Sequence, residues 1–233
     1  MEEESGLARQ IDSYCERMDF TFWGEPINAV SNAAFVIAAL WMWMRIERLG
    51  AGDAAGIGKV LCAMLAGTGV GSFLWHTFAT AWAVSIDVAF IALFTLTYIY
   101  AANRYFWELG VWLAGFGALL FLPYASVVGS AFAQLPFFEI SFFYWPIPLL
   151  IFAYGIALWQ RRPATGRGLV LGASLLVVSL FFRSIDEAIC DHVHVGSHFL
   201  WHVLNGIMLG WMIEVLRRVG AGQGGNVARG STA

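Results

Sequence analysis

The stretch AVSIDVAFIALFTLTYIYAA, residues 83–102, carries only one charged side chain, Asp87. A helix needs roughly 20 residues to cross a hydrocarbon core that is about 30 Å thick. The stretch lacks the strict alternation of apolar and polar residues that is typical of strands in a membrane barrel. A helix also satisfies its own backbone hydrogen bonds inside lipid. The stretch therefore predicts a transmembrane helix.

Six further apolar runs indicate that the chain crosses the membrane seven times. Of the 233 residues, 59% are hydrophobic and 12% are charged, and the mean hydropathy is +0.69. A soluble domain would have about 25% charged residues. We therefore expect an all-α integral membrane protein, a seven-helix transmembrane bundle formed by residues 28–218. The other six expected spans are 28–46, 57–79, 106–122, 140–160, 167–182 and 197–216.

The two ends of the chain differ in composition from the spans between them. Residues 1–27 form a segment rich in carboxylates. Residues 219–233 form a Gly-rich polar tail, which we expect to be disordered because it has nothing to bury.

The basic residues predict how the bundle is oriented, because cytoplasmic loops carry an excess of Lys and Arg. With the N-terminus outside and the C-terminus in the cytoplasm, ten basic residues fall on the inner side and three on the outer side. This distribution is that of a membrane protein and not of a nucleic-acid-binding groove, which argues against nucleic acid as a partner. The inner residues are Arg45, Arg48, Lys59, Arg104, Arg161, Arg162, Arg167, Arg217, Arg218 and Arg229, and the outer ones are Arg9, Arg17 and Arg183.

Five polar side chains are expected at a similar depth near the outer surface. Ser72 and His76 are four residues apart at the outer end of the second span, and so are His198 and His202 at the start of the seventh. Residues at this spacing share one face of a helix. Asp87 lies about one turn into the third span. Ionisable residues inside a membrane are costly and mark a functional site by default.

Each of these residues also has a purely structural interpretation. His76 could bond to a carbonyl near a helix end, Asp87 could interact with the dipole of its helix, and Ser72 could let two helices approach closely. Three histidines together, however, supply the three ligands of a catalytic zinc, which keeps its fourth position open for water. Zinc is therefore favoured over a satisfied polar cluster. His192 and His194 alternate in the outer loop and are expected to be solvated.

The segment before the first span contains a second group of polar residues. Asp12, Glu16, Asp19 and Glu25 are interleaved with aromatic residues, which suggests a segment packed on the bundle. Carboxylates, amides and backbone carbonyls are the ligands of calcium, although a solvated acidic face is the alternative. Cys15 in this segment and Cys190 before the seventh span are both on the expected outer side, where disulfides persist.

The motifs together resemble one known family. They are YCE at 14–16, ExxN at 25–28, SN at 31–32, GxxSxxxH at 69–76, an Asp eleven residues later, DxxxC at 186–190 and HxxWH at 198–202. This set looks like the alkaline ceramidases of the CREST superfamily of seven-helix membrane hydrolases. The short, Arg-dominated, Gly- and Ala-rich chain suggests a bacterial homologue in the inner membrane, with its active site towards the periplasm.

The resemblance implies hydrolysis of the amide of ceramide, or of a related N-acyl lipid, to a fatty acid and a sphingoid base or other amine. It implies a catalytic zinc held by His76, His198 and His202, with Ser72 and Asp87 beside it. It also implies a Cys15–Cys190 disulfide. An activating calcium would be bound by Asp12, Tyr14, Glu16, Asp19 and Glu25, but Arg17 and Met18 depart from the family's pattern where a carboxylate and an amide would be expected.

The expected mechanism is general acid–base catalysis with a metal-activated water. Zinc lowers the pKa of a bound water towards about 7. Asp87 would accept the proton and return it to the leaving amine, and Ser72 would donate a hydrogen bond to the oxyanion. The lipid substrate would enter from the membrane, and we expect no obligate protein partner.

Other classes of seven-helix protein fit less well. A retinal protein needs a lysine inside the bundle, but the only lysine is Lys59 at the inner end of a span. A lipid receptor related to adiponectin receptors would share the three histidines but is expected to have the opposite orientation. A transporter would need polar residues that continue towards the inner face.

Overall fold

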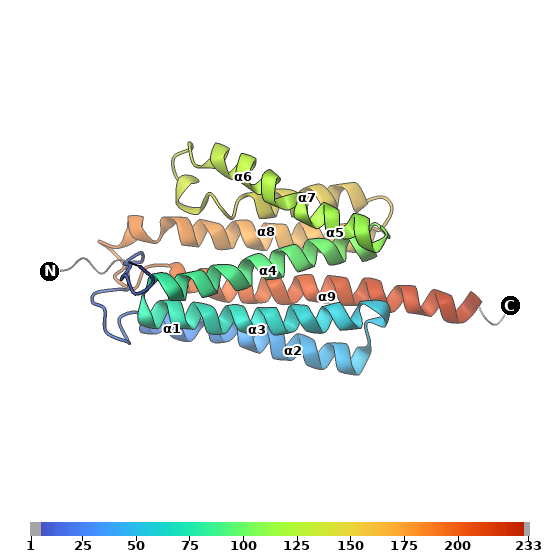
Figure 1. Ribbon diagram of the computed structural model, residues 1–233, viewed down its shortest axis with the longest axis horizontal. Helices are drawn as coiled ribbons and strands as arrows, with labels where there is room; N and C mark the ends of the chain where they lie inside the picture. Colours follow the sequence, from blue (N-terminus) through green and yellow to red (C-terminus); the bar gives the residue numbers. More distant parts are fainter. Residues whose placement is uncertain (1–5, 231–233) are drawn as a thin grey trace.

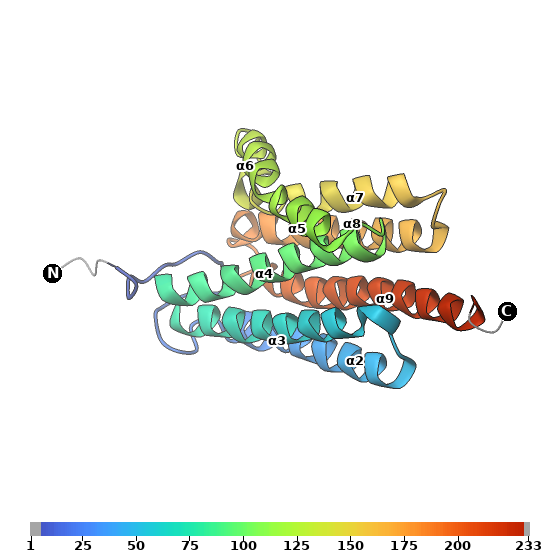
Figure 2. The same ribbon diagram turned by 45° about the vertical axis from the view of Figure 1, so that its right-hand side comes forward.

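The computed structural model describes residues 6–230 and the side chains of residues 6–222; residues 1–5 and 231–233 lie outside the described part. The described chain is helical. The α-helices are α1 (Pro26–Ser31), α2 (Ala33–Leu49), α3 (Ala55–Phe78), α4 (Ala81–Tyr105), α5 (Val111–Leu119), α6 (Phe121–Phe132), α7 (Pro146–Leu158), α8 (Pro163–Ile185) and α9 (His198–Gly230), and the short 3-10 helices are η1 (Gly52–Ala54), η2 (Glu139–Ser141) and η3 (Glu187–Ile189). The helices α2, α3, α4, α8 and α9 run along the long axis of the molecule, whereas α5 and α6 are inclined to it (Figures 1 and 2).

Six helical segments of the described chain are long and apolar enough to cross a membrane. Two of them combine a pair of helices, α1 with α2 and α5 with α6, and α7 is a shorter apolar helix. The protein is therefore a multi-pass membrane protein built from helices, as expected, while the count of seven crossings stays a prediction. The six segments are Pro26–Leu49, Gly52–Phe78, Ala81–Phe106, Val111–Phe132, Pro163–Ile185 and His198–Gly222.

The fourth segment and the shorter helix α7 begin later than predicted. The expected span 106–122 is observed as Val111–Phe132, because the chain turns after α4. In this turn the backbone N–H of Leu109 bonds to the carbonyl of Asn103, and Glu108 has a positive φ of 58°. The expected span 140–160 is observed as α7, which begins at Pro146. Proline has no N–H to donate and is favoured in the first turn of a helix.

The last helix forms the centre of the bundle. Of the six segments, His198–Gly222 has the largest buried share, and it packs against α2, α3 and α8. It approaches the first span closely at Gly206, where a Cβ would lie 2.9 Å from the backbone carbon of Ala34. Only a residue without a side chain permits this approach. The helix continues to Gly230, whereas the sequence predicted disorder from residue 219.

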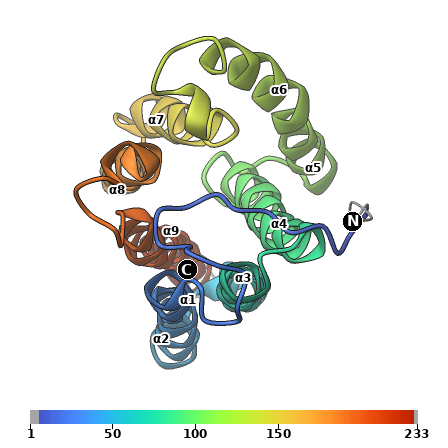
Figure 3. The same ribbon diagram turned by 90° about the vertical axis from the view of Figure 1, so that its left-hand side faces the viewer.

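The N-terminal segment, residues 6–25, crosses one end of the bundle (Figure 3). It pairs with the loop between α3 and α4: the N–H of Ile11 bonds to the carbonyl of Ala79 at 2.8 Å, and that of Ala81 to the carbonyl of Arg9 at 3.0 Å. Both helices that carry the three histidines have their histidine-bearing ends here, because α3 finishes and α9 begins at this end.

Candidate metal centre

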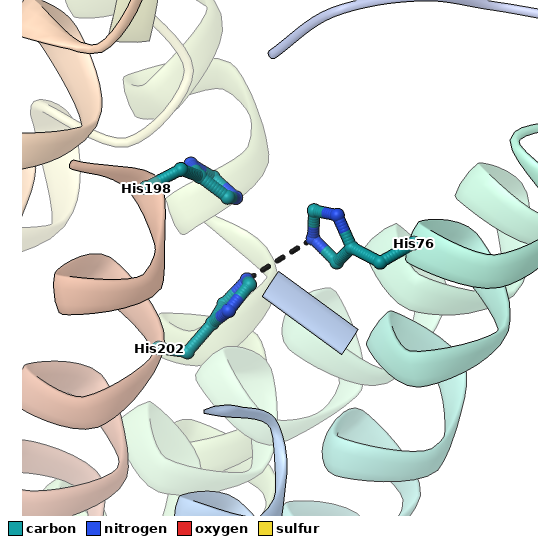
Figure 4. A group of neighbouring side chains, drawn as sticks. All are labelled: His76, His198 and His202. Carbon is teal, nitrogen blue, oxygen red and sulfur yellow. Dashed lines mark hydrogen bonds between the residues drawn. The ribbon is translucent and has the colours of Figure 1, made fainter. Parts of the chain in front are cut away.

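Three histidines from two helices converge beneath the N-terminal segment. His76 lies in the last turn of α3, and His198 and His202 lie in the first two turns of α9. All three are buried, with exposed fractions of 1%, 2% and 0%. One ring nitrogen from each lies within 4.8 Å of the others, and the rings surround a common point (Figure 4). These residues, here called the histidine cluster, were the ones that the sequence predicted as metal ligands.

The proton of His76 is fixed by a carboxylate. Its Nδ1 lies 2.6 Å from Oε2 of Glu25. Burial raises the pKa of Glu25, but the hydrogen bond and charge of His76, the hydrogen bond from Asn28 and the charge of Arg17 outweigh burial and lower that pKa below its ordinary value. An ionised carboxylate only accepts hydrogen bonds. His76 therefore donates a hydrogen bond from Nδ1, and in its neutral form the ring presents a lone pair on Nε2.

The proton of His202 is fixed in the same way by a hydroxyl group. Its Nδ1 lies 2.7 Å from Oγ of Ser31. The hydroxyl of Ser31 donates its single proton to the carbonyl of Asn28 at 2.8 Å, so its oxygen is left to accept. His202 thus donates from Nδ1 and also presents a lone pair on Nε2.

The two lone pairs face each other. The Nε2 atoms of His76 and His202 lie 3.1 Å apart (Figure 4). Two lone pairs at this distance repel each other unless a positive charge lies between them. Two histidine ligands of one tetrahedral zinc, each 2.0–2.1 Å from the metal, would be about 3.3–3.4 Å apart. The arrangement therefore fits a shared metal ion, and it has the second hydrogen bond that orients most metal-binding histidines.

His198 completes the cluster. Its ring stacks on that of Tyr14 with centroids 3.7 Å apart, and among the described residues its buried Nδ1 has no hydrogen-bond partner. An unpaired buried nitrogen is costly, which also favours a bound cation. The sequence could not reveal that Tyr14 contributes its ring, since it was predicted only as a calcium ligand.

Asp186, the aspartate of the DxxxC motif, holds the start of α9 in place, a role that the sequence did not indicate. Its Oδ1 accepts hydrogen bonds from the N–H groups of Ser197 at 2.6 Å and His198 at 2.9 Å, and its Oδ2 accepts from that of Cys15 at 3.0 Å. A Cβ at Gly196, where φ is +65°, would lie 2.1 Å from Oδ1 of Asp186. Asp186 lies twelve residues before α9 in the sequence, so no local helix-start pattern could have revealed this contact.

A disulfide ties the N-terminal segment to the loop before α9. Cys15 and Cys190 are bonded, with their Cα atoms 5.3 Å apart, and Cys62 is free and buried. The predicted pairing is confirmed. His192 and His194 lie in the same loop and are exposed, as expected for solvated residues.

Ser72 and Asp87 line a cavity of about 60 Å³ that is otherwise mostly apolar. Ser72 lies one turn before His76, and Asp87 packs closely on α3, since a Cβ at Gly71 would lie 3.1 Å from Cα of Asp87. The cavity borders the histidine cluster through Phe35, whose ring contacts His202. These two predicted catalytic residues thus line one cavity, which is related to the cluster through Phe35 and not lined by the three histidines themselves.

The five residues predicted to bind calcium are not brought together in this way. The histidine cluster is the only group of three or more His, Cys, Asp or Glu side chains in the described part of the chain that could hold a metal. Asp12 and Asp19 are exposed, Glu16 and Glu25 are buried and hydrogen-bonded to other groups, and Tyr14 stacks on His198.

Fold and site together define a class of protein: a multi-pass helical membrane protein with a buried three-histidine group that could bind a metal ion. No protein-family model matches the chain, and a search of curated proteins finds no significant match.

Proposed function

We propose that the protein is a zinc-dependent amide hydrolase of the membrane, which cleaves ceramide or a related N-acyl lipid to a fatty acid and a free amine. The observation that carries this proposal is the pair of facing Nε2 lone pairs on His76 and His202, 3.1 Å apart. A cavity with a carboxylate and a hydroxyl lies beside them. When bound, zinc supplies Lewis acidity and a water of lowered pKa.

The polar groups of the cavity support an amide substrate. Among the described residues, Oδ1 of Asp87 and Nδ2 of Asn205 are buried without a hydrogen-bond partner, and both residues line the cavity. Buried polar groups are rarely left unpaired in a protein. An amide offers both an acceptor and a donor, so it would satisfy both atoms at once.

The protein's own groups have distinct roles in this proposal. Asp87 is the general base that takes the proton from the attacking water and returns it to the leaving amine. Ser72 donates a hydrogen bond to the carbonyl oxygen as negative charge develops. Apolar neighbours such as Phe94, Ile147 and Leu176 line the same cavity and would contact the acyl chain.

The distribution of charge supports an orientation with the histidine cluster on the outer side. Arg45, Arg48, Lys59 and Arg104 lie at the ends of α2, α3 and α4 that are remote from the cluster. By the positive-inside rule this remote end faces the cytoplasm. In a bacterium the site would then face the periplasm, with substrate supplied by the outer leaflet of the inner membrane.

The proposal is tested by incubating the purified protein with ceramide, N-acylethanolamines and N-acyl amino acids and measuring the fatty acid released. Zinc content is measured on the same samples. Release that depends on zinc supports the hydrolase. A zinc-loaded protein that cleaves no lipid amide would contradict it and favour a lipid receptor.

A further inference from the structure

The guanidinium group of Arg17 lies at the centre of the N-terminal segment, although the sequence predicted a metal cation for this segment. Arg17 is 5% exposed. Its Nε donates to Oε1 of Glu25 at 2.5 Å, its Nη1 to the carbonyl of Asp19 at 2.9 Å, and its Nη2 to the carbonyl of His76 at 2.9 Å. One positive charge thus joins the N-terminal segment to the end of α3.

The backbone around Arg17 is shaped to contain the guanidinium. A Cβ at Gly24 would lie 2.8 Å from Nη1 of Arg17 and 2.5 Å from the carbonyl oxygen of Asp19. Glycine is therefore needed at this position for the arginine to reach Glu25 in its present conformation.

The oxygen atoms expected to bind calcium are already engaged. The two oxygens of Glu16 accept from the N–H groups of Ile27 and Asn28, both at 2.7 Å. The carbonyl of Tyr14 accepts from the N–H of Arg17 at 3.2 Å.

The two remaining carboxylates offer no better site. Oδ1 of Asp19 accepts from the N–H and the hydroxyl of Thr21, and Asp12 is exposed. Calcium takes 6–8 oxygen ligands, and a divalent ion beside Glu25 would be repelled by Arg17. The five residues expected as calcium ligands therefore do not fit a calcium ion.

We propose that Arg17 is the built-in cation of the N-terminal segment and replaces calcium. It neutralises Glu25 and fixes the carboxylate where it accepts the Nδ1 proton of His76. Arg17 is therefore a positioning residue that acts on the histidine cluster through Glu25, and the segment docks on the bundle without calcium. This inference rests on the metal-binding part of the proposed function and not on hydrolysis.

Calcium titration of the wild-type protein tests the replacement directly. Protein in metal-depleted buffer receives calcium, with magnesium as a control, and no chelator is added because a chelator would also withdraw zinc. We expect no bound calcium in equilibrium dialysis and no saturable rise in Tm. Calcium at about a hundred times its Kd would raise Tm by roughly 5–10 °C. Stoichiometric calcium together with such a rise would overturn the proposal.

Substitution of Arg17 tests its effect on the histidine cluster. Arg17→Gln leaves Glu25 buried without its cation, so we expect a Tm lower by on the order of 10 °C. We also expect zinc to dissociate roughly 10–100-fold faster, as after loss of a group that orients a ligand. Arg17→Lys keeps the positive charge but loses the planar guanidinium group. Its Tm and its zinc dissociation rate should lie between those of the wild type and of Arg17→Gln.

The matched control is Arg9→Gln, which removes an exposed arginine of the same segment. Its Tm and its zinc dissociation rate should equal those of the wild type. Zinc dissociation is measured well below Tm, so a purely structural effect of Arg17 would leave it unchanged. Wild-type zinc dissociation in Arg17→Gln would overturn the positioning role. If this variant does not fold, the calcium titration of the wild type still decides whether the segment binds calcium. Neither readout requires hydrolysis, so an inactive protein would leave both tests valid.

Discussion

His76 and His202 come from different helices, yet each forms a hydrogen bond from its Nδ1 to an acceptor oxygen. Their Nε2 atoms face each other at 3.1 Å. The acceptors, Glu25 and Ser31, both lie near the start of the first span. That region therefore determines which nitrogen of each ring is free to bind a metal.

Zinc should be present in stoichiometric amount. Metal analysis of the purified protein should find about one zinc per chain, because three histidines are the usual protein ligands of a catalytic zinc. The metal should be lost in His198→Ala and His202→Ala. His192→Ala, which alters an exposed histidine six residues from His198, is the control. Full zinc retention in both cluster variants would contradict the site.

Loss of the carboxylate of Asp87 should abolish turnover while the zinc and the fold are kept. Asp87→Asn is nearly isosteric but cannot accept a proton at neutral pH. Loss of a positioned general base costs roughly 10²–10⁴ in rate, whereas loss of a helix-capping group costs only about 1 kcal/mol of stability.

Lipid amide hydrolysis and thermal unfolding of the Asp87→Asn protein separate these two roles. Asp53→Asn changes an exposed aspartate near the opposite end of the bundle and should leave both unchanged. Near-wild-type hydrolysis by a zinc-loaded Asp87→Asn protein would show that the base lies elsewhere.

Removing the hydroxyl of Ser31 should weaken metal binding without removing a ligand. Ser31→Ala removes the hydroxyl oxygen that accepts from Nδ1 of His202, so the ring is held less firmly in the tautomer that presents Nε2. Loss of such an orienting group typically lowers metal affinity by about 10–100-fold. Competition with a zinc-binding dye would measure the change, and Ser174→Ala, at an exposed serine of α8, should show none. An unchanged affinity in Ser31→Ala would mean that this hydrogen bond does not select the tautomer.

Glu25 should make the protein more stable at neutral pH than in acid. Its pKa in the folded protein is lowered below its ordinary value, so its contribution is present above the unfolded pKa of about 4.3 and is lost as the pH falls through the lower, folded value. Thermal unfolding of Glu25→Gln and of the wild type is compared from pH 7 downwards. The difference between their Tm values should become smaller in this acid range. A constant gap would contradict the role of the ionised carboxylate.

The sequence predicted the positions of the histidines because two features were readable: the helical spacing, and the direction in which each span crosses the membrane. Together they give the depth of each residue in the membrane. Ser72 and His76, or His198 and His202, share a face by periodicity alone. The start of the fourth span was predicted at residue 106 and is observed at Val111, because a hydropathy pattern does not reveal the turn around Glu108.

The hydrogen bonds from His76 to Glu25 and from His202 to Ser31 were not predictable from the sequence either. They join residues 51 and 171 positions apart, and no local pattern encodes contacts over such separations. For the same reason the acidic residues of the N-terminal segment predicted calcium, and no local pattern indicated that the guanidinium of Arg17 is buried beside Glu25.

The placement of two histidines on the last helix has a consequence for biosynthesis. A nascent chain is made from its N-terminus at about 5–20 residues per second, and α9 is the last helix to be made. A partly inserted chain holds Glu25, Ser31 and His76 but has neither partner histidine. The three-histidine group is therefore completed only after α9 has been translated, so truncated products left in the membrane would lack two of its three members.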